Sequence, residues 1–135
     1  MAANVIVDAG FLVALLNRRE TRHRWTVGQL PHLPLPWKTC EAVLSETFYL
    51  LGAHGFELIA LLRRRAVVCE FQVDDEIDSV LDLMAKYEDV PMSFADACLV
   101  RMTEMLTDPT VVTLDMHFRV YRRHGNKAIP CTMPN

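Results

Sequence analysis

The sequence predicts an α/β fold in which helices cover both faces of a central parallel sheet. Two patterns support this prediction. Short, uninterrupted apolar runs such as residues 5–7 and 110–114 are typical of buried strands, and the longer segments between them have apolar residues at helical spacing. Strands that alternate with helices favour a parallel sheet. The chain has 135 residues, which suits a single domain spanning residues 1–135.

The first half of the chain is expected to form two strands, each followed by two helices. Residues 4–7 are apolar or nearly so throughout, which predicts that the first strand is central in the sheet. Thr39 is a suitable N-cap for the helix that follows the second strand. The expected elements are a strand at 4–7, helices at 11–16 and 23–30, a strand at 35–38, and helices at 40–51 and 56–65.

The second half repeats this alternation. Asp74 or Asp75 is expected to cap a helix that ends near Tyr87, and Ser93 to cap the next one. Turns are expected at 108–109 and 124–126, where Pro and Gly interrupt the apolar pattern. The remaining expected elements are a strand at 67–71, a helix from 93 to about 107, a strand at 110–114, a short helix at 116–121 and a last strand at 128–131.

Composition limits the functional classes. A net charge of −3 gives no overall attraction to nucleic acid, but it does not exclude a local basic surface. The four cysteines are scattered without a Cys-x-x-Cys pair, so we expect buried thiols in a reducing compartment rather than disulfides or a zinc site. The start of the chain lacks the basic region of a signal peptide, and no uncharged apolar run is long enough to span a bilayer. We therefore expect a cytoplasmic protein with no membrane contact.

Four acidic residues are placed where they can meet. Asp8 and Asp115 follow predicted strands, Asp96 lies in the first turn of a helix, and Glu46 borders the apolar face of another. The carboxyl ends of parallel strands share one edge of the sheet, so the four carboxylates are expected to converge there. Crowded carboxylates repel each other unless a cation neutralises them, and oxygen ligands suit Mg²⁺ or Mn²⁺. Such an ion assists hydrolysis of a phosphodiester.

Each acid also has a purely structural explanation. Asp8 and Asp115 can cap the helices that follow them, and Ser93-x-x-Asp96 has the form of a capping box. Glu46 can be an ordinary surface residue of a helix. The argument for a site therefore depends on all four acids occurring together at strand ends and inward helix edges.

The chain resembles the PIN domain family, in its VapC-like and PilT-N-terminus-like branch. The resemblance lies in residues 7–16 (VDAGFLVALL), the helix that carries Glu46, residues 95–97 (ADA) and residues 113–118 (TLDMHF), and it covers nearly the whole chain. It implies a three-layer α/β/α fold and a metal-dependent endoribonuclease that cleaves RNA. The resemblance assigns Asp8, Glu46, Asp96 and Asp115 as the catalytic, metal-binding acids.

The same resemblance implies partners. It suggests the toxin of a toxin–antitoxin pair, with an antitoxin protein that masks the acidic site. It also implies a homodimer, for which the apolar region from Trp25 to Trp37 is a suitable interface.

Two positions depart from the family pattern. Gly10 stands two residues after Asp8, where many PIN domains have Ser or Thr, so one hydroxyl near the acids is missing. Leu99 and Val100 occupy the turn where some members carry a further acid, which implies that a second metal ion would be weakly held.

The basic residues have two interpretations. They can contact RNA phosphates, or they can be solvated helix ends and loops, and Arg101 is expected to lie nearer the acids than the others. The five histidines lack metal-binding spacing, and Trp25 and Trp37 are expected in the core or an interface. The basic residues concerned are Arg18, Arg19, Arg22, Arg24, Arg63, Arg64, Arg65, Arg119, Arg122 and Arg123.

Two other functional classes compete with the nuclease. A non-catalytic PIN-like module would keep the fold without productive metal binding, and Gly10 is its support in the sequence. A phospho-accepting receiver domain has a similar length, but it requires an acidic pair after the first strand and a Lys after the last one. Here Asp8 stands alone and Lys127 precedes the last expected strand, which argues against this class.

Overall fold

The computed structural model describes residues 2–135 and has a parallel five-stranded sheet at its centre. The strand order is β3-β2-β1-β4-β7, and every neighbouring pair is parallel. The first strand is therefore the central one, as its apolar sequence predicts. The strands are β1 (Asn4–Val7), β2 (Trp37–Lys38), β3 (Val67–Val68), β4 (Pro109–Val112) and β7 (Cys131–Thr132).

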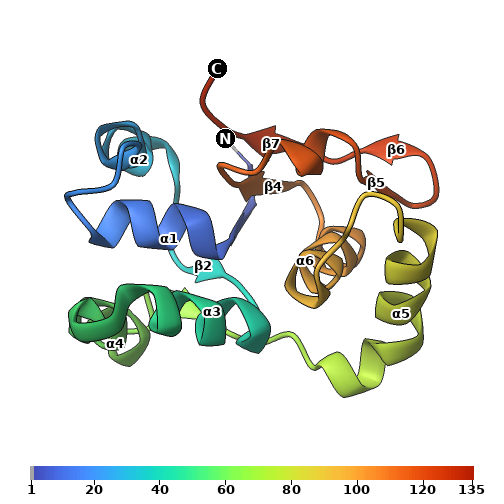
Figure 1. The fold of residues 1–135 in the computed structure, drawn as a ribbon, viewed down its shortest axis with the longest axis horizontal. Coiled ribbons are helices and arrows are strands. Elements are labelled where there is room, and N and C mark those ends of the chain that lie inside the picture. The colour runs from blue at the N-terminus through green and yellow to red at the C-terminus, as the bar shows by residue number, and fades with distance from the viewer. Residues whose placement is uncertain (1) are drawn as a thin grey trace.

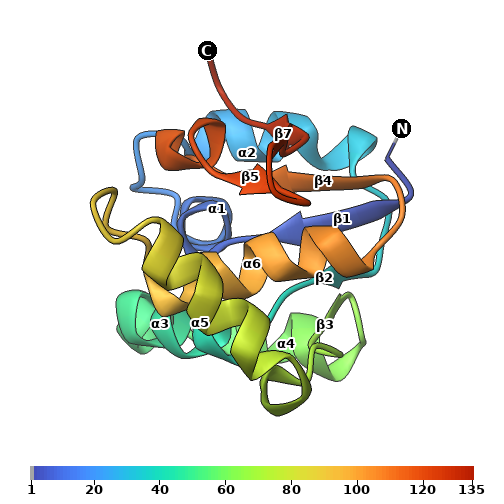
Figure 2. The ribbon, with the colours of Figure 1, turned by 90° about the vertical axis from the view of Figure 1, so that its right-hand side faces the viewer.

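Helices flank the sheet. In Figure 1, α1 and α2 lie on the left of the central strands and α5 and α6 on the right, with α3 and α4 below α1. Figure 2 shows α6 lying across β1 and below β4, and α6 contacts both strands. The helices are α1 (Ala9–Leu16), α2 (His23–Gln29), α3 (Glu41–Leu51), α4 (Phe56–Arg63), α5 (Ile77–Lys86) and α6 (Phe94–Met105). Short 3₁₀ helices occur at Leu30–His32, Gly52–His54, Val73–Glu76 and Met116–Arg119.

The centre of the sheet is fully buried. Ile6 pairs with Val111 and Val7 with Val112, and all four side chains have no exposed surface. Burial of each such side chain contributes about 1.5–3 kcal/mol. The two strands end side by side, so the residues that follow them, at positions 8 and 113–115, are held at the same edge of the sheet. No helix within residues 2–135 has the length and apolar character needed to cross a membrane.

The C-terminal segment differs from the prediction. The last short strand is present but shifted, at Cys131–Thr132 instead of 128–131, and an unexpected antiparallel hairpin, β5 (Arg122–Arg123) and β6 (Lys127–Ala128), precedes it. The turn at 124–126 is where the sequence predicts it, with left-handed backbone at His124 (φ 50°) and Gly125 (φ 87°). Pro130 has no N–H for strand pairing, but its carbonyl accepts a 2.9 Å hydrogen bond from the Val111 amide and leads into β7.

Two expected helix caps are wrong. The Thr39 hydroxyl does not cap α3 but donates a 2.8 Å hydrogen bond to the carbonyl of Val7, which ties β2 to the end of β1. Asp74 and Asp75 lie within the 3₁₀ turn before α5, whose N-cap is Glu76 without a side-chain hydrogen bond. A buried carbonyl at the end of β1 needs a donor, and this need outweighs the capping preference of Thr39. The four cysteines are free thiols, of which Cys40 and Cys98 are buried, as expected, whereas Cys69 and Cys131 are partly exposed.

Candidate active site

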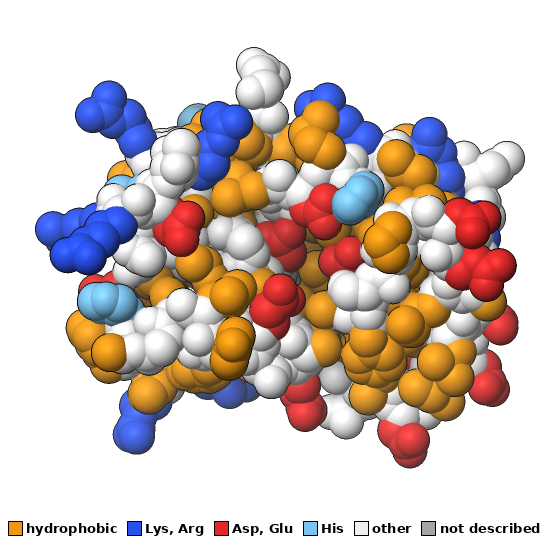
Figure 3. Space-filling view, in the orientation of Figure 1, with side chains coloured by type: hydrophobic (Ala, Val, Ile, Leu, Met, Phe, Trp, Pro, Cys, Tyr) orange, Lys and Arg blue, Asp and Glu red, His pale blue; other side chains and the backbone are white. Residues whose placement is uncertain are grey.

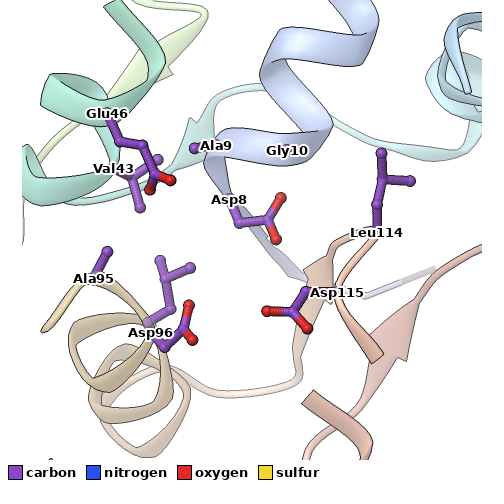
Figure 4. Close-up of a pocket in the computed structure, with 10 residues that line it drawn as sticks. Asp8, Ala9, Gly10, Val43, Glu46, Ala95, Asp96, Leu114 and Asp115 are labelled. Atoms are coloured by element: carbon purple, nitrogen blue, oxygen red, sulfur yellow. The ribbon is translucent and has the colours of Figure 1, made fainter. Parts of the chain in front are cut away.

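All four predicted acids line one pocket of about 300 Å³ at the carboxyl edge of the sheet. They come from four different elements, and Figure 4 shows their carboxylates turned toward a common space. Figure 3 shows acidic side chains gathered around a hollow near the middle of this face. The pocket lining contains no Lys or Arg. The residues that line it are Asp8, Ala9, Gly10, Val43, Glu46, Ala95, Asp96, Leu99, Leu114 and Asp115.

Asp8 is the deepest of the acids, with 8% of its surface exposed. It directly follows β1 and is the N-cap of α1, because its Oδ1 accepts a 2.9 Å hydrogen bond from the Phe11 amide. Its Oδ2 accepts a hydrogen bond from the Thr113 hydroxyl. Asp8 is therefore a helix cap and a pocket residue at once, so the two interpretations of this residue do not exclude each other.

Asp96 is half-buried in the first turn of α6. Its backbone amide donates a 3.0 Å hydrogen bond to Oγ of Ser93, so Ser93 is the cap of the helix, as predicted. Its own carboxylate stays close enough to Ser93 for hydrogen bonds from that residue to lower its pKa, and its Oδ2 accepts a 2.9 Å hydrogen bond from the hydroxyl of Tyr121. The carboxylate of Asp96 is thus held by the C-terminal segment and faces the pocket.

Asp115 follows β4 and is half-buried. Its amide donates a 2.9 Å hydrogen bond to the Thr113 hydroxyl, which places Thr113 between Asp8 and Asp115. Its Oδ1 accepts a 2.9 Å hydrogen bond from the His117 amide and lies 3.1 Å from Nδ1 of the same histidine. Asp115 caps the 3₁₀ turn at Met116–Arg119, so it also combines a capping role with a place in the pocket.

Glu46 lies on α3, one turn after Val43, and is exposed at the mouth of the pocket. Within residues 2–135 its carboxylate has no hydrogen bond or ion pair with another side chain. In Figure 4 it points toward the other three acids rather than away from them. Its position fits the predicted site, whereas its exposure resembles that of a surface glutamate.

The acids affect one another electrostatically. Burial raises the pKa of Asp8 to about 6, the hydrogen bonds from Thr113 and Phe11 oppose this, and the charges of Asp96 and Asp115 add to it. The pKa of Asp96 is raised by burial and by Asp115, against the hydrogen bond from Tyr121. A carboxyl with a raised pKa gains from any nearby positive charge, which is the property expected of a cation site.

The four carboxylates of the pocket are chemically suited to bind a divalent metal ion. Carboxylate oxygens are the ligands that Mg²⁺ and Mn²⁺ prefer, and no Lys or Arg lines the pocket. Among the described residues, no three Asp, Glu, His or Cys side chains are close enough together to hold one ion as they stand. Binding therefore requires the carboxylates to draw closer, which a cation favours by removing their mutual repulsion.

Several basic side chains considered at the sequence level are engaged elsewhere. Arg101 is not near the acids: it forms ion pairs with Glu76 at 2.8 Å and Glu104 at 3.1 Å. Arg122 donates to the carbonyls of Arg119 and Tyr121. The ion pairs of Arg101 join α6 to the turn before α5, and the bonds of Arg122 lie within the C-terminal segment, so the interpretation of these arginines as RNA contacts loses support.

Comparison with known proteins agrees with this geometry. The PIN domain family model matches residues 5–123. The chain belongs to the PIN domain family. Members of this family are typically metal-dependent nucleases. A search of curated protein sequences found no match.

The fold of this PIN domain is also found in a solved structure. The crystal structure of VapC20 from Mycobacterium tuberculosis, a toxin that cleaves the sarcin–ricin loop, superposes with a TM-score of 0.72. The two chains are 21% identical over 80% of this chain and 87% of that chain. At this identity the likeness concerns the fold.

Sequence reasoning missed two residues of the PIN domain site, Thr113 and Tyr121. Thr113 carries a weak signal, because it is a hydroxyl residue at the end of a buried apolar strand and two positions before Asp115. Tyr121 carries no local signal, since it lies 25 positions from Asp96. Gly10 has an ordinary backbone conformation, and a Cβ there would lie 3.8 Å from Oδ1 of Asp8, so the backbone leaves room for the missing hydroxyl residue.

Proposed function

We propose that this PIN domain is a Mg²⁺- or Mn²⁺-dependent endoribonuclease that hydrolyses RNA phosphodiester bonds. The observation that supports this most strongly is the convergence of Asp8, Glu46, Asp96 and Asp115, from four elements, on one pocket that no Lys or Arg lines. VapC20, which shares the fold, is a toxin that cleaves the sarcin–ricin loop. The role of a toxin in a toxin–antitoxin pair belongs to the same proposal.

In this proposal Asp8, Asp96 and Asp115 hold the ion, and Glu46 either binds it or orients the attacking water. The ion supplies Lewis-acid chemistry, by which it stabilises negative charge on the phosphodiester and makes water a better nucleophile. The protein supplies the orientation: Thr113 holds Asp8, and Tyr121 holds Asp96. Glu46 is exposed and has no side-chain partner within residues 2–135, so in this proposal its carboxylate can accept a proton from water at the mouth of the pocket.

The proposal is tested with purified protein and labelled single-stranded RNA. We expect cleavage with Mg²⁺ or Mn²⁺, no cleavage in excess EDTA, and a loss of at least about 100-fold in the Asp96→Asn variant. Asp78→Asn is the matched control, because Asp78 is also an acid in the first turn of a helix but lies on α5, outside the pocket. It should cleave like the wild type, which would show that the loss in Asp96→Asn is specific to the pocket, and the loss itself excludes a contaminating ribonuclease.

Two results would reject the proposal in different ways. Undiminished cleavage in EDTA would exclude a metal-dependent mechanism. Binding of Mn²⁺ without cleavage of any RNA would favour the non-catalytic PIN-like module, which takes the same fold and keeps the acids.

We further propose that the chain forms a homodimer and that a small antitoxin protein covers the acidic pocket. Leu30 and Leu35 are 40% and 61% exposed in the predicted interface region, whereas Trp37 is buried and belongs to the core. Analytical ultracentrifugation over a range of concentrations tests the dimer, and a monomer at every concentration would contradict it.

A further inference from the structure

A second cleft of about 650 Å³ lies at the carboxyl end of α1, where α1, α2 and the start of α4 meet. Leu16 and Val27 contribute apolar surface to it. Basic groups line the rest of the cleft, with Glu57 as the one acidic side chain in the lining. These basic groups are Arg18, Arg19, His23 and His54.

The guanidinium groups of Arg18 and Arg19 are not neutralised by the protein. Both side chains are exposed, and neither has an ion pair with a carboxylate within residues 2–135. The Arg19 amide donates a 3.0 Å hydrogen bond to the side chain of Asn17, which fixes the backbone where the two arginines leave α1. This differs from the engaged arginines of α6 and the C-terminal segment, and it leaves two planar cations available to a ligand.

His23 adds a polar group with a defined orientation. Its Nδ1 lies 2.8 Å from the carbonyl of Ala14, and because a carbonyl only accepts, Nδ1 carries the proton. Nε2 remains as the second polar atom of the ring. Apolar surface beside guanidinium and imidazole groups suits a nucleotide, which has a base or sugar to pack and a phosphate to bind.

The cleft and the acidic pocket lie at opposite ends of one helix. Asp8 caps the start of α1, and Arg18 and Arg19 follow its end at Leu16. Eight residues of α-helix span about 12 Å. In Figure 3, basic side chains gather at the end of the molecule where α1 joins α2 in Figure 1, and acidic side chains surround the hollow near its middle. A strand of a few nucleotides can reach both places.

We propose that this cleft is a nucleotide subsite for single-stranded RNA, in which Arg18 and Arg19 bind phosphates a few nucleotides away from the one in the acidic pocket. The subsite rests on the proposed nuclease function and extends it, because it explains how an acidic pocket in a chain of charge −3 retains a polyanion. The arginines supply the attraction, and the acids act on the phosphodiester that this attraction positions.

The test is binding of a fluorescein-labelled 12-nucleotide single-stranded RNA, followed by anisotropy in EDTA so that no strand is cut. The variant is Arg18→Gln/Arg19→Gln, and the control is Arg63→Gln/Arg64→Gln, which removes the same charge from exposed residues at the end of α4. We expect affinity to fall on the order of tenfold in the first variant alone at about 0.1 M salt. The slope of log K against log salt should decrease by about 1.4, since each phosphate contact on a single strand contributes about 0.7.

Three outcomes overturn the subsite. These are unchanged RNA affinity in Arg18→Gln/Arg19→Gln, an equal loss in both double variants, and a glutamate-rich decapeptide that binds the wild type more tightly than RNA does and requires the same arginines. The last outcome would make the cleft a docking site for an acidic protein segment.

Failure of the subsite and failure of the nuclease function are distinguishable. RNA that requires the arginines for binding but is not cut in Mn²⁺ removes the nuclease and leaves the subsite. RNA that is cut by Arg18→Gln/Arg19→Gln with the wild-type KM removes the subsite and leaves the nuclease.

Discussion

The hydroxyl of Tyr121 donates a 2.9 Å hydrogen bond to Oδ2 of Asp96 from a fully buried position. The ring of Tyr121 packs edge-on against Tyr87 and Phe118, with ring centroids 5.2 Å apart in each case. Its amide also donates a 3.0 Å hydrogen bond to the carbonyl of His117. A donor held this firmly fixes the orientation of the Asp96 carboxylate in the pocket.

Tyr121→Phe is therefore expected to weaken Mn²⁺ binding while it preserves the packing of the ring. Loss of a residue that orients a metal ligand typically costs about 10–100-fold in metal affinity. Isothermal titration calorimetry with Mn²⁺ measures the change. Tyr87→Phe is the control, because it also removes a hydroxyl from this aromatic cluster. The hydroxyl of Tyr87 accepts a hydrogen bond from the Arg122 amide and bonds to none of the four acids. Equal Mn²⁺ affinity in the two variants would contradict an orienting role for Tyr121.

Thr113 connects two of the acids, and its hydroxyl is expected to matter for stability. In Thr113→Val, Asp8 loses a hydrogen-bond donor and the amide of Asp115 loses its acceptor. A buried polar group left without a partner costs about 1–3 kcal/mol, so the free energy of unfolding should fall by at least this amount. Thr110→Val, on the same strand, breaks one hydroxyl pair with Thr132 and should cost about 1 kcal/mol or less. Urea denaturation of both variants makes the comparison, and equal losses would contradict the argument.

The acids and the central strand were predictable because short-range rules determine their positions. An uninterrupted apolar run places residues 4–7 in the middle of a parallel sheet, and Asp8 then has to stand at its carboxyl edge. Asp96 follows a Ser cap at fixed spacing, and Asp115 follows β4. In each case the pattern that builds the element also fixes where the acid lies.

Features that depend on contacts between distant segments were not predictable. The partner of Tyr121 lies 25 positions away, and the partners of Arg101 include Glu76, also 25 positions away on another element. Thr39 satisfies a carbonyl of β1 rather than the helix that follows it, because the tertiary need exceeds the local preference. The hairpin β5–β6 is formed by strands of two residues each, too short for a period-2 pattern to reveal.

Glu46→Gln distinguishes a pocket acid from a surface glutamate. Glu46 is exposed and has no side-chain partner among the described residues, so its substitution should change the free energy of unfolding by less than about 0.5 kcal/mol. It should nevertheless lower RNA cleavage in Mn²⁺ by about 100-fold, if it binds the ion or accepts a proton from water. Glu41→Gln, an exposed acid in the first turn of the same helix, is the control. Equal activity in the two variants would show that Glu46 is an ordinary surface residue with no role in cleavage.

The raised pKa of Asp8 predicts a window of pH-dependent stability without divalent metal. The pKa rises from 3.8 to about 6 on folding, so between about pH 4 and pH 6 the folded protein keeps a proton that the unfolded chain has released. The free energy of unfolding should therefore fall as the pH rises through this window, by up to about 3 kcal/mol relative to Asp8→Asn, which does not titrate.

Urea denaturation at several pH values between 4 and 8 measures the difference between wild type and Asp8→Asn. Mn²⁺ should restore wild-type stability at pH 7, because the ion binds the charged carboxylate. A stability difference that is constant across the window would show that Asp8 does not titrate there.

The last prediction separates the two roles of Asp96 with the substitution Asp96→Asn. The asparagine keeps the backbone N–H that donates to Oγ of Ser93, and its side-chain oxygen can accept from the hydroxyl of Tyr121. Both hydrogen bonds can therefore persist. If Asp96 served only the helix dipole, the loss of charge would cost about 0.3–1 kcal/mol, as it should for Asp78→Asn in the first turn of α5. We expect instead that Asp96→Asn without metal is as stable as the wild type or more so, since repulsion from Asp115 is relieved.

Mn²⁺ provides the second comparison for Asp96→Asn. A metal at 100 times its Kd stabilises the folded state by about 2.7 kcal/mol, and this gain from Mn²⁺ should shrink or vanish in Asp96→Asn but not in Asp78→Asn. Thermal unfolding with and without Mn²⁺ measures both effects, and a less stable Asp96→Asn variant that keeps the full Mn²⁺-dependent rise in Tm would reduce Asp96 to a helix-capping residue.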